Sequence, residues 1–150
     1  MPIISGGSGG IAPASLGREQ FFGGGTTNIG AGGTAALTWA HGQNDVLVDL
    51  TSPTAPALLV AGVYVLSVIA QGAGLAAGEG FQLQTDMDLN GDDAEAIATL
   101  LNMPASGNPR LCVTQSWYCG VGAVLQAQVD NFSASTVSYQ ILEANLQRVA

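Results

Sequence analysis

The residues best placed to hold a metal ion form the run Asp86-Met87-Asp88-Leu89-Asn90-Gly91-Asp92. Oxygen-bearing side chains recur at alternate positions (Asp86, Asp88, Asn90 and Asp92), and a glycine stands sixth, as at the start of a calcium-binding loop. The twelfth position is Ile97, where such a loop needs a bidentate glutamate. A polar strand face that runs into an Asn-Gly turn explains the same residues. We therefore predict no bound metal and no other cofactor, with these four residues as the candidate ligands.

Catalytic chemistry has little support in the sequence. His41 is the single histidine and lies in a stretch rich in Gly, Asn and Asp, so no second imidazole exists to share a zinc ion. No nucleophile-elbow motif accompanies it. The glycine run Gly23-Gly24-Gly25 lacks the strand-turn-helix context of a phosphate-binding loop. We predict that the protein is not an enzyme.

Cys112 and Cys119 are seven residues apart. In one continuous strand they would be about 23 Å apart at ~3.3 Å per residue, which is too far for a disulfide bond. Free cysteine packs as a small hydrophobic residue, so we predict two buried free thiols. Neither cysteine requires an oxidising compartment.

The composition fits one domain with a substantial core, because 47% of the 150 residues are hydrophobic. There is no lysine, and three arginines against 11 acids give a formal charge of −8. A chain with so few cations cannot neutralise phosphates, so we predict no nucleic-acid partner. The uncharged stretch 50–78 is long enough to span a bilayer as a helix. Prolines and glycines interrupt it and no Lys or Arg flanks it, so we also predict no membrane association.

Residues 1–33 contain 11 of the 21 glycines and no segment that resembles a signal peptide. A segment of this composition orders poorly unless something holds it. We predict an extended Gly-rich N-terminal arm over residues 1–33, followed by one domain over residues 34–150. The apolar residues of the arm would dock on a partner: Ile3, Ile4, Ile11, Leu16, Phe21 and Phe22. The alternative is a tail without a partner.

The densest apolar run is Ala57–Ala70. It is rich in β-branched residues, which pack well in a pleated sheet. Leu66 and Val68 lie on one face of such a strand and Val65 and Ile69 on the other, so both faces are apolar. This pattern predicts a central strand that is covered on both sides.

The remaining elements are also expected to be strands. We predict two short strands at Thr34–Trp39 and Val46–Leu50 joined by a turn at His41–Asp45, an alternating strand at Phe81–Leu89 that leads into a hairpin at Asn90-Gly91, and further strands at Leu111–Cys119 and Ala123–Asn131. Residues 93–103 and 136–149 fit either a strand or a helix, and we assign both to strands. About eight short strands with frequent turns indicate a sandwich or jelly roll.

Trp117 and Tyr118 are adjacent, so their side chains would point to opposite faces of a strand. One ring is expected in the core and the other on the surface. Together with the two-faced strand, this pattern indicates a second apolar surface. On an acidic domain such a surface favours self-association.

Several short motifs resemble a known family. Ala61-Gly62-Val63-Tyr64, which leads into an apolar strand, resembles the "aGvY" strand of trimeric jelly rolls of the tumour necrosis factor and complement-head type. Tyr118–Val124 resembles that family's later strand-turn-strand, and Val129-Asp130-Asn131 and Tyr139–Leu146 occupy the corresponding closing places. The resemblance covers residues 34–150. It implies an all-β, antiparallel jelly-roll sandwich that forms a homotrimer.

Related domains occur in bacteriophage structural proteins. This chain resembles that branch of the family, because it has no signal peptide and no lysine, and a Gly-rich arm precedes one compact domain. The resemblance therefore implies a virion structural protein, namely a trimeric capsid decoration or cement protein at the capsid surface. Its arm would bind the major capsid protein, and the trimer interface would include aromatic residues: Tyr64, Trp117, Tyr118 and Tyr139. The alternative is a tail-fibre or surface-tip module that recognises a glycan or receptor.

Overall fold

The computed structural model describes residues 17–22, 24–44, 47–89 and 95–150. The regular elements in these ranges are all β-strands: β1 (Arg18–Phe22), β2 (Thr27–Ile29), β3 (Thr34–Ala36), β4 (His41–Asn44), β5 (Val48–Asp49), β6 (Ala57–Leu58), β7 (Gly62–Ala73), β8 (Phe81–Asp86), β9 (Glu95–Leu100), β10 (Arg110–Cys119), β11 (Gln126–Asn131) and β12 (Val137–Arg148). No helix in the described ranges has the length and apolar character needed to cross a membrane.

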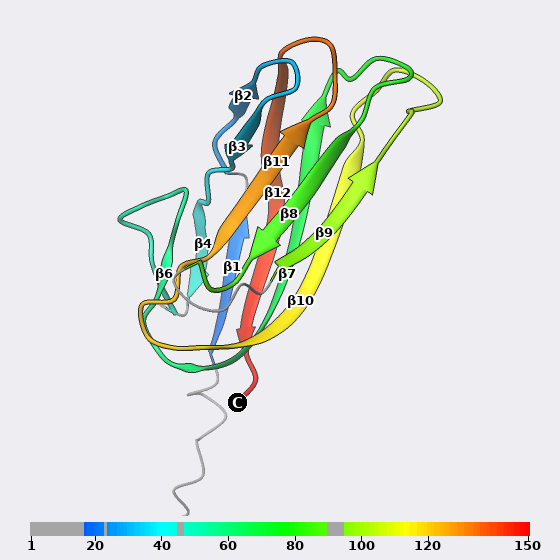
Figure 1. The fold of residues 1–150 in the computed structure, drawn as a ribbon. Helices are drawn as coiled ribbons and strands as arrows, with labels where there is room; N and C mark the ends of the chain where they lie inside the picture. The colour runs from blue at the N-terminus through cyan, green and yellow to red at the C-terminus, as the bar shows by residue number, and fades with distance from the viewer. Residues whose placement is uncertain (1–16, 23, 45–46, 90–94) are drawn as a thin grey trace, which may run out of the picture.

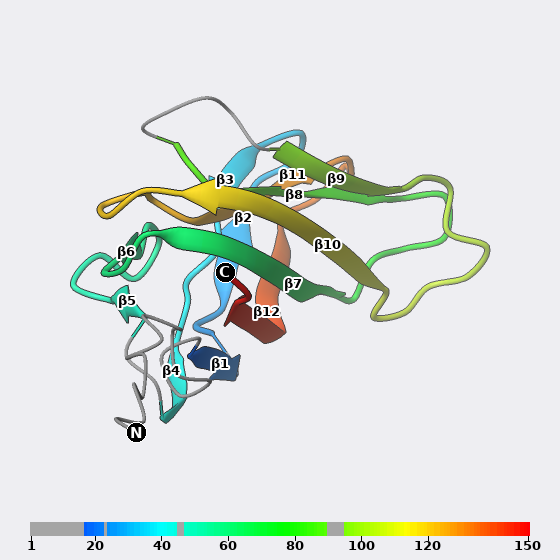
Figure 2. The same ribbon diagram turned by 90° about the horizontal axis from the view of Figure 1, so that it is seen from below.

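The strands form an antiparallel jelly-roll sandwich, which confirms the predicted fold class. The six-stranded sheet has the order β10-β7-β12-β1-β4, with β2 also paired to β12. The four-stranded sheet has the order β3-β11-β8-β9, and β5 and β6 form a small separate ribbon. Figure 1 shows β8, β9 and β11 in front of β7 and β12, and Figure 2 shows the two layers from below.

The predicted central strand is present as β7, which pairs with β10 on one side and β12 on the other. It begins at Gly62 rather than at Ala57, because residues 57–58 form β6 instead. Leu66, Val68 and the other residues of the same parity are fully buried between the sheets. The opposite parity, which includes Val65 and Ile69, is only partly buried. One face of β7 is thus core, and the other lacks a cover within the described chain.

Residues 93–103 and 136–149 contain strands β9 and β12, as predicted. The helix-like spacing in β12 comes from a bulge between Ile141 and Glu143, where the register with β7 shifts. One extra residue in a strand moves every later side chain to the other face. The inward residues are therefore Ile141 and Ala144, three positions apart, as they would be on a helix.

Two alternating strands of the four-stranded sheet agree with the prediction. Phe81, Leu83 and Thr85 of β8 point into the core, and Leu125, Ala127 and Val129 in and before β11 are fully buried. Gly80, just before β8, packs so closely against the Leu100 backbone that no side chain fits there. A Cβ on Gly80 would lie 2.1 Å from the Leu100 carbonyl oxygen. The predicted Asn90-Gly91 turn lies outside the described residues.

The predicted boundary at residue 34 needs a correction. β1 pairs with β12 from Arg18↔Gln147 to Phe22↔Glu143, and β2 pairs with β12 as well. Residues 18–22 and 27–29 are therefore part of the sandwich, because backbone pairing with β12 places them in the sheet despite the Gly-rich composition of this region. The prediction of a separate arm still applies to residues 1–16, which lie outside the described ranges.

The predicted turn at His41–Asp45 is also wrong. Residues 41–44 form the edge strand β4, which pairs with β1, for example at Gln20↔Gln43. The two strands expected on either side of the turn do not pair with each other, since β3 pairs with β11 and β5 with β6. Strict alternation fails in the second of them, because Leu47 and Val48 are both buried.

Candidate functional site: two surfaces suited to assembly

The first candidate surface is the outer face of the six-stranded sheet. In antiparallel strands, directly opposed residues share a face. The register therefore places Val63, Val65 and Ile69 of β7 beside residues of β10, in the pairs Tyr118↔Val63, Ser116↔Val65 and Cys112↔Ile69. We call this set of apolar side chains (Val63, Val65, Ile69 and Tyr118) the outer-face stripe.

The outer face carries few charges on its three long strands. Hydroxyl and amide side chains such as Ser67, Thr114 and Asn145 surround the outer-face stripe, while Arg110 and Glu143 are the charged residues of β7, β10 and β12 on this side. Acids lie instead on the outside of the four-stranded sheet, where the Gln84 amide donates to Glu95 Oε1 over 2.9 Å. The charges of opposite sign on the outer face largely balance, whereas the outside of the four-stranded sheet carries acids such as Asp130 and Glu95.

The predicted interface tyrosines lie elsewhere. Tyr64 and Tyr139 have the inward parity of their strands and are fully buried in the core. The Tyr64 hydroxyl donates to the Val60 carbonyl oxygen, and the Tyr139 hydroxyl donates to Asn131 Oδ1 over 2.7 Å. Because neither ring reaches the surface, the prediction that these two residues form a trimer interface is wrong.

Trp117 and Tyr118 both remain candidates for an interface. Tyr118 is 64% exposed on the outer face, and Trp117 is 40% exposed although it has the inward parity. The prediction that one of them is a core residue is therefore wrong. β10 is the edge strand of its sheet, and its inward side is only partly covered at Trp117, although Cys119 two residues later is buried.

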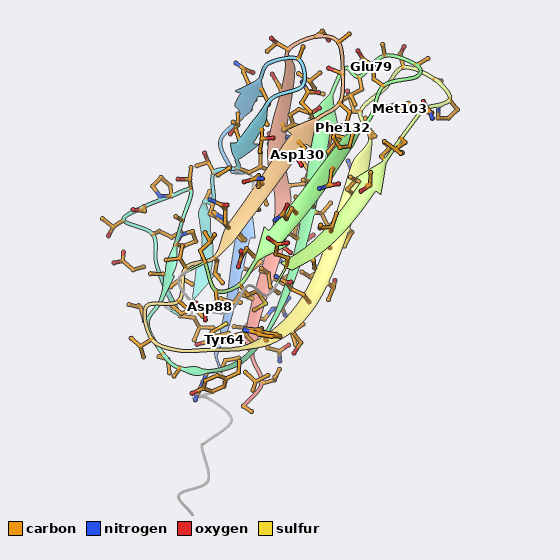
Figure 3. All side chains as sticks on the ribbon, viewed as in Figure 1. Tyr64, Glu79, Asp88, Met103, Asp130 and Phe132 are labelled. Carbon is orange, nitrogen blue, oxygen red and sulfur yellow. The ribbon has the colours of Figure 1, made fainter. Side chains whose placement is uncertain are left out.

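The second candidate surface lies at the end of the sandwich where the chain terminates, which we call the basal end. Figure 3 shows Tyr64 and Asp88 toward this end and Glu79, Met103 and Phe132 at the opposite one. Four aliphatic side chains at the basal end are 40–70% exposed, and we call them the basal patch: Leu59, Val60, Val121 and Val149. No sequence pattern marks them as one group, because Leu59 and Val60 lie within the apolar run Ala57–Ala70 and Val121 and Val149 stand alone near a turn and the end of β12.

Two residues of the predicted capsid-binding arm are in the sheet. Phe21 and Phe22 belong to β1 and pair through their backbone with Ala144 and Glu143. The prediction that they form part of a free arm is wrong, because a strand paired on both sides is held by its neighbours. Ile3, Ile4, Ile11 and Leu16 lie outside the described residues, so their docking role remains a prediction.

The candidate calcium ligands are only partly described. Asp86 is buried at the end of β8, and its Oδ1 accepts the Asp88 backbone N–H over 2.9 Å. Asn90 and Asp92 lie outside the described residues. Within the described ranges, His, Cys, Asp and Glu side chains form no group of three or more that could hold a metal ion. The two aspartates thus have a structural role in a turn.

The cysteines are both free, but only one is buried. Cys119 lies in the core and its Sγ donates to the Met87 carbonyl oxygen over 3.2 Å. Burial, followed by the nearby Asp88 and Asp86 carboxylates, raises the pKa of the Cys119 thiol to about 11. Cys112 is exposed on the outer face, so the prediction that it is buried is wrong.

A shallow cavity of about 290 Å³ opens where β2, β7 and β12 meet. Its lining is uncharged and mixes apolar surface with amide and hydroxyl groups: Thr26, Gln71, Ala73, Ser138, Tyr139 and Gln140. This volume is near the lower limit for sites that bind small molecules. Amide and hydroxyl groups of this kind can hydrogen-bond a neutral polar ligand.

Comparison with solved structures places this architecture in a known class. The chain is similar to Eiger TNF from S. frugiperda, with a TM-score of 0.62 and 12% identity over 89% of this chain and 92% of that one. It is similar to the PRD1 vertex protein P5, with a TM-score of 0.60 and 10% identity over 90% and 98%. Murine APRIL gives a TM-score of 0.58 and 9% identity over 88% and 98%. Neither a family model nor a curated protein matches the sequence.

The protein therefore has the jelly-roll fold of tumour necrosis factor-like proteins, as the sequence motifs predicted. The same fold is present in a phage vertex protein. At identities of 9–12% the likeness concerns the fold. That this chain is not an enzyme remains a prediction.

Proposed function

We propose that the protein is a virion structural protein that assembles as a homotrimer through the outer face of the six-stranded sheet. The observation that carries the trimer is the outer-face stripe on a long central strand, surrounded by uncharged polar side chains. An apolar stripe without a cover on a chain of charge −8 is best explained by contact between copies, since this face adds little repulsion. The fold shared with the PRD1 vertex protein P5 supports the virion role.

The virion role proposed here is that of a capsid decoration or cement protein, with the major capsid protein as its partner. Residues 1–16 precede Gly17, whose carbonyl oxygen accepts the Arg148 N–H over 3.2 Å at the basal end. The arm thus starts at the basal end, and this end would face the shell. Ile3 and Ile4, at the far end of the arm, would contact the capsid protein.

Solution mass by light scattering tests the trimer. The native chain is expected at three times 15.1 kDa. The double variant V65D/I69D is expected to be monomeric, because six carboxylates would be buried without partners in one interface. The matched control is Ile97→Asp, which changes an exposed residue on the outside of the four-stranded sheet and should leave the trimer intact. A monomeric native chain would refute this interface.

Capsid attachment is a separate experiment. Deletion of residues 1–16 removes the proposed arm and leaves β1 in place, whereas a longer deletion to residue 30 would remove two strands of the sheet. The shortened chain and the variant I3S/I4S should remain trimeric and fail to bind particles that lack the protein. Retained binding by both would refute the role of the arm.

A second candidate function is recognition of a glycan or receptor at a tail-fibre or surface tip. The observation that favours it is the uncharged cavity beside Gln71, Ser138 and Gln140. A glycan-array screen of the native chain and of Gln140→Ala separates the two functions. Binding that is lost in the variant would support recognition, and an array without signal would leave the decoration role.

A further inference from the structure

The basal patch is not explained by the proposed trimer, because its four residues lie at the end of the sandwich rather than on the outer face. Leu59 and Val60 lie in the bend before β7, Val121 in the turn after β10, and Val149 after β12. Each exposes between 40% and 70% of its surface. Four large aliphatic side chains grouped at one end indicate a docking surface.

Hydrogen bonds link these residues to the point where the described chain begins. The Arg148 N–H donates to the Gly17 carbonyl oxygen over 3.2 Å, which places Gly17 beside Val149. On its other side Gly17 touches Leu47, since a Cβ on Gly17 would lie 2.7 Å from Leu47 Cδ2. The Leu47 carbonyl oxygen in turn accepts the Leu59 N–H over 2.8 Å. Gly17 is therefore close to Val149 through Arg148 and close to Leu59 through Leu47.

The turn that carries Val121 reaches the same place. The Gly122 N–H donates to the Leu58 carbonyl oxygen over 2.8 Å, which brings Val121 next to Leu59. The described chain thus begins, at Gly17, beside the basal patch. Residues 11–16, with the sequence IAPASL, carry no charge and include Ile11 and Leu16. Six residues reach about 20 Å when extended, which is enough to cross such a patch.

Tethering favours this segment over other occupants. A segment joined directly to the surface it covers has a high effective concentration there, so a few apolar contacts suffice to hold it. Residues 5–10 read SGGSGG and have no apolar side chain to bury. They separate Ile11 and Leu16 from Ile3 and Ile4, so the two pairs can serve different surfaces.

We propose that residues 11–16 cover the basal patch of their own chain, with Ile11 and Leu16 packed against Leu59, Val60, Val121 and Val149. This docking is independent of any capsid. It leaves Ile3 and Ile4 available for the partner named in the proposed function. It also fixes the root of the arm at the basal end, so that the arm leaves the body in one direction.

Amide hydrogen exchange of the full chain, measured by mass spectrometry, tests the docking. In the variant I11S/L16S, residues 57–62 and 119–124 should exchange roughly tenfold faster, which corresponds to about 1.4 kcal/mol. The variant I3S/I4S is the matched control and should leave these amides unchanged. Because both variants alter residues outside the sandwich, the fold itself is not at risk.

Substitutions in the basal patch itself provide a second test, in which the exchange of residues 11–16 is measured. In L59S/V121S, residues 11–16 should lose protection, whereas Phe132→Ser at the opposite end should have no effect on them. The docking would be overturned if I11S/L16S left the patch amides unchanged or if I3S/I4S had the same effect. Patch protection that fell on dilution in the native chain would also overturn it, because a second copy would then be the cover.

Discussion

Asn131 is the residue whose loss should most clearly weaken the fold. It is the last residue of β11, is 1% exposed, and joins four parts of the chain. Its Nδ2 donates to the carbonyl oxygens of Ile29, Gly30 and Ser135 at 2.9–3.0 Å. Its Oδ1 accepts the Ser133 N–H over 3.0 Å and the Tyr139 hydroxyl over 2.7 Å.

The variant Asn131→Ala leaves two buried donors, the Ser133 N–H and the Tyr139 hydroxyl, without an acceptor. Each unsatisfied buried group costs about 1–3 kcal/mol, so we expect a loss of about 3–5 kcal/mol in the free energy of unfolding. Asn131→Asp keeps the acceptor but sets a second carboxylate oxygen against three carbonyl oxygens, so it should be at least as damaging. Tyr139→Phe removes one hydroxyl and should cost about 1–1.5 kcal/mol.

Urea denaturation at one fixed protein concentration measures these differences, because an oligomer's stability depends on concentration. Asn28→Ala is the control, since Asn28 is an exposed asparagine of the neighbouring β2, and its change should be within about 0.5 kcal/mol. If Asn131→Ala destabilised no more than Tyr139→Phe, the view of Asn131 as a junction between strands would be refuted.

Three further predictions concern the thiols, the alkaline limit of stability and salt. The native chain should react with at most one equivalent of a thiol reagent, at Cys112, which is exposed in the single chain, and the unfolded chain with two; two fast equivalents in the native chain would contradict the burial of Cys119. Burial, with a smaller contribution from Glu79, raises the pKa of Tyr139 to about 12 from its ordinary 10.0, and the pKa of Cys119 is raised to about 11 from 9.0. The unfolded chain therefore releases these protons at lower pH than the folded chain, so the free energy of unfolding should be full below pH 9 and fall as the pH rises through 9–12. Above pH 10 the fall should be shallower in Tyr139→Phe. Equal slopes of stability against pH in the native chain and the variant, measured by calorimetry, would contradict this assignment. Association should become stronger as the salt concentration is raised, because salt screens the repulsion between chains of charge −8 and leaves the apolar contacts of the outer-face stripe unaffected. If light scattering showed that salt dissociates the trimer, ion pairs would hold it instead.

The strands that the sequence predicted are those whose side chains fill the core. β7, β8 and β11 have alternating or continuous apolar residues that match their burial. β4 was missed because HGQN has no strand preference of its own, and β1 and β2 were missed because their Phe, Thr and Ile residues lie in short segments of a Gly-rich region. They become strands through pairing with β12 and β1, a long-range effect that no local pattern contains.

Which face of a strand becomes core is harder to predict than the strand itself. Both faces of β7 are apolar, so the pattern could not tell whether Tyr64 or Val65 would point inward. The bulge in β12 has the same effect, because it exchanges the two faces after Ile141. The predicted interface therefore contained Tyr64 and Tyr139, which point into the core and alternate along their strands with the residues of the outer face.

The distribution of charged residues over the two sheets determines which face can contact another copy of the chain. A chain of charge −8 without lysine repels its own copies, so association needs a surface from which the acids are excluded. β7 supplies such a surface, because its outer face is built from Val, Ile, Ser and Gln, and β10 adds Ser, Thr, Cys and Tyr beside it. Carboxylates such as Asp130 and Glu95 lie on the other sheet, where they accept hydrogen bonds from Gln82 and Gln84. Repulsion between copies would thus be weakest for contact through the outer face, where Glu143 is the one carboxylate of β7, β10 and β12.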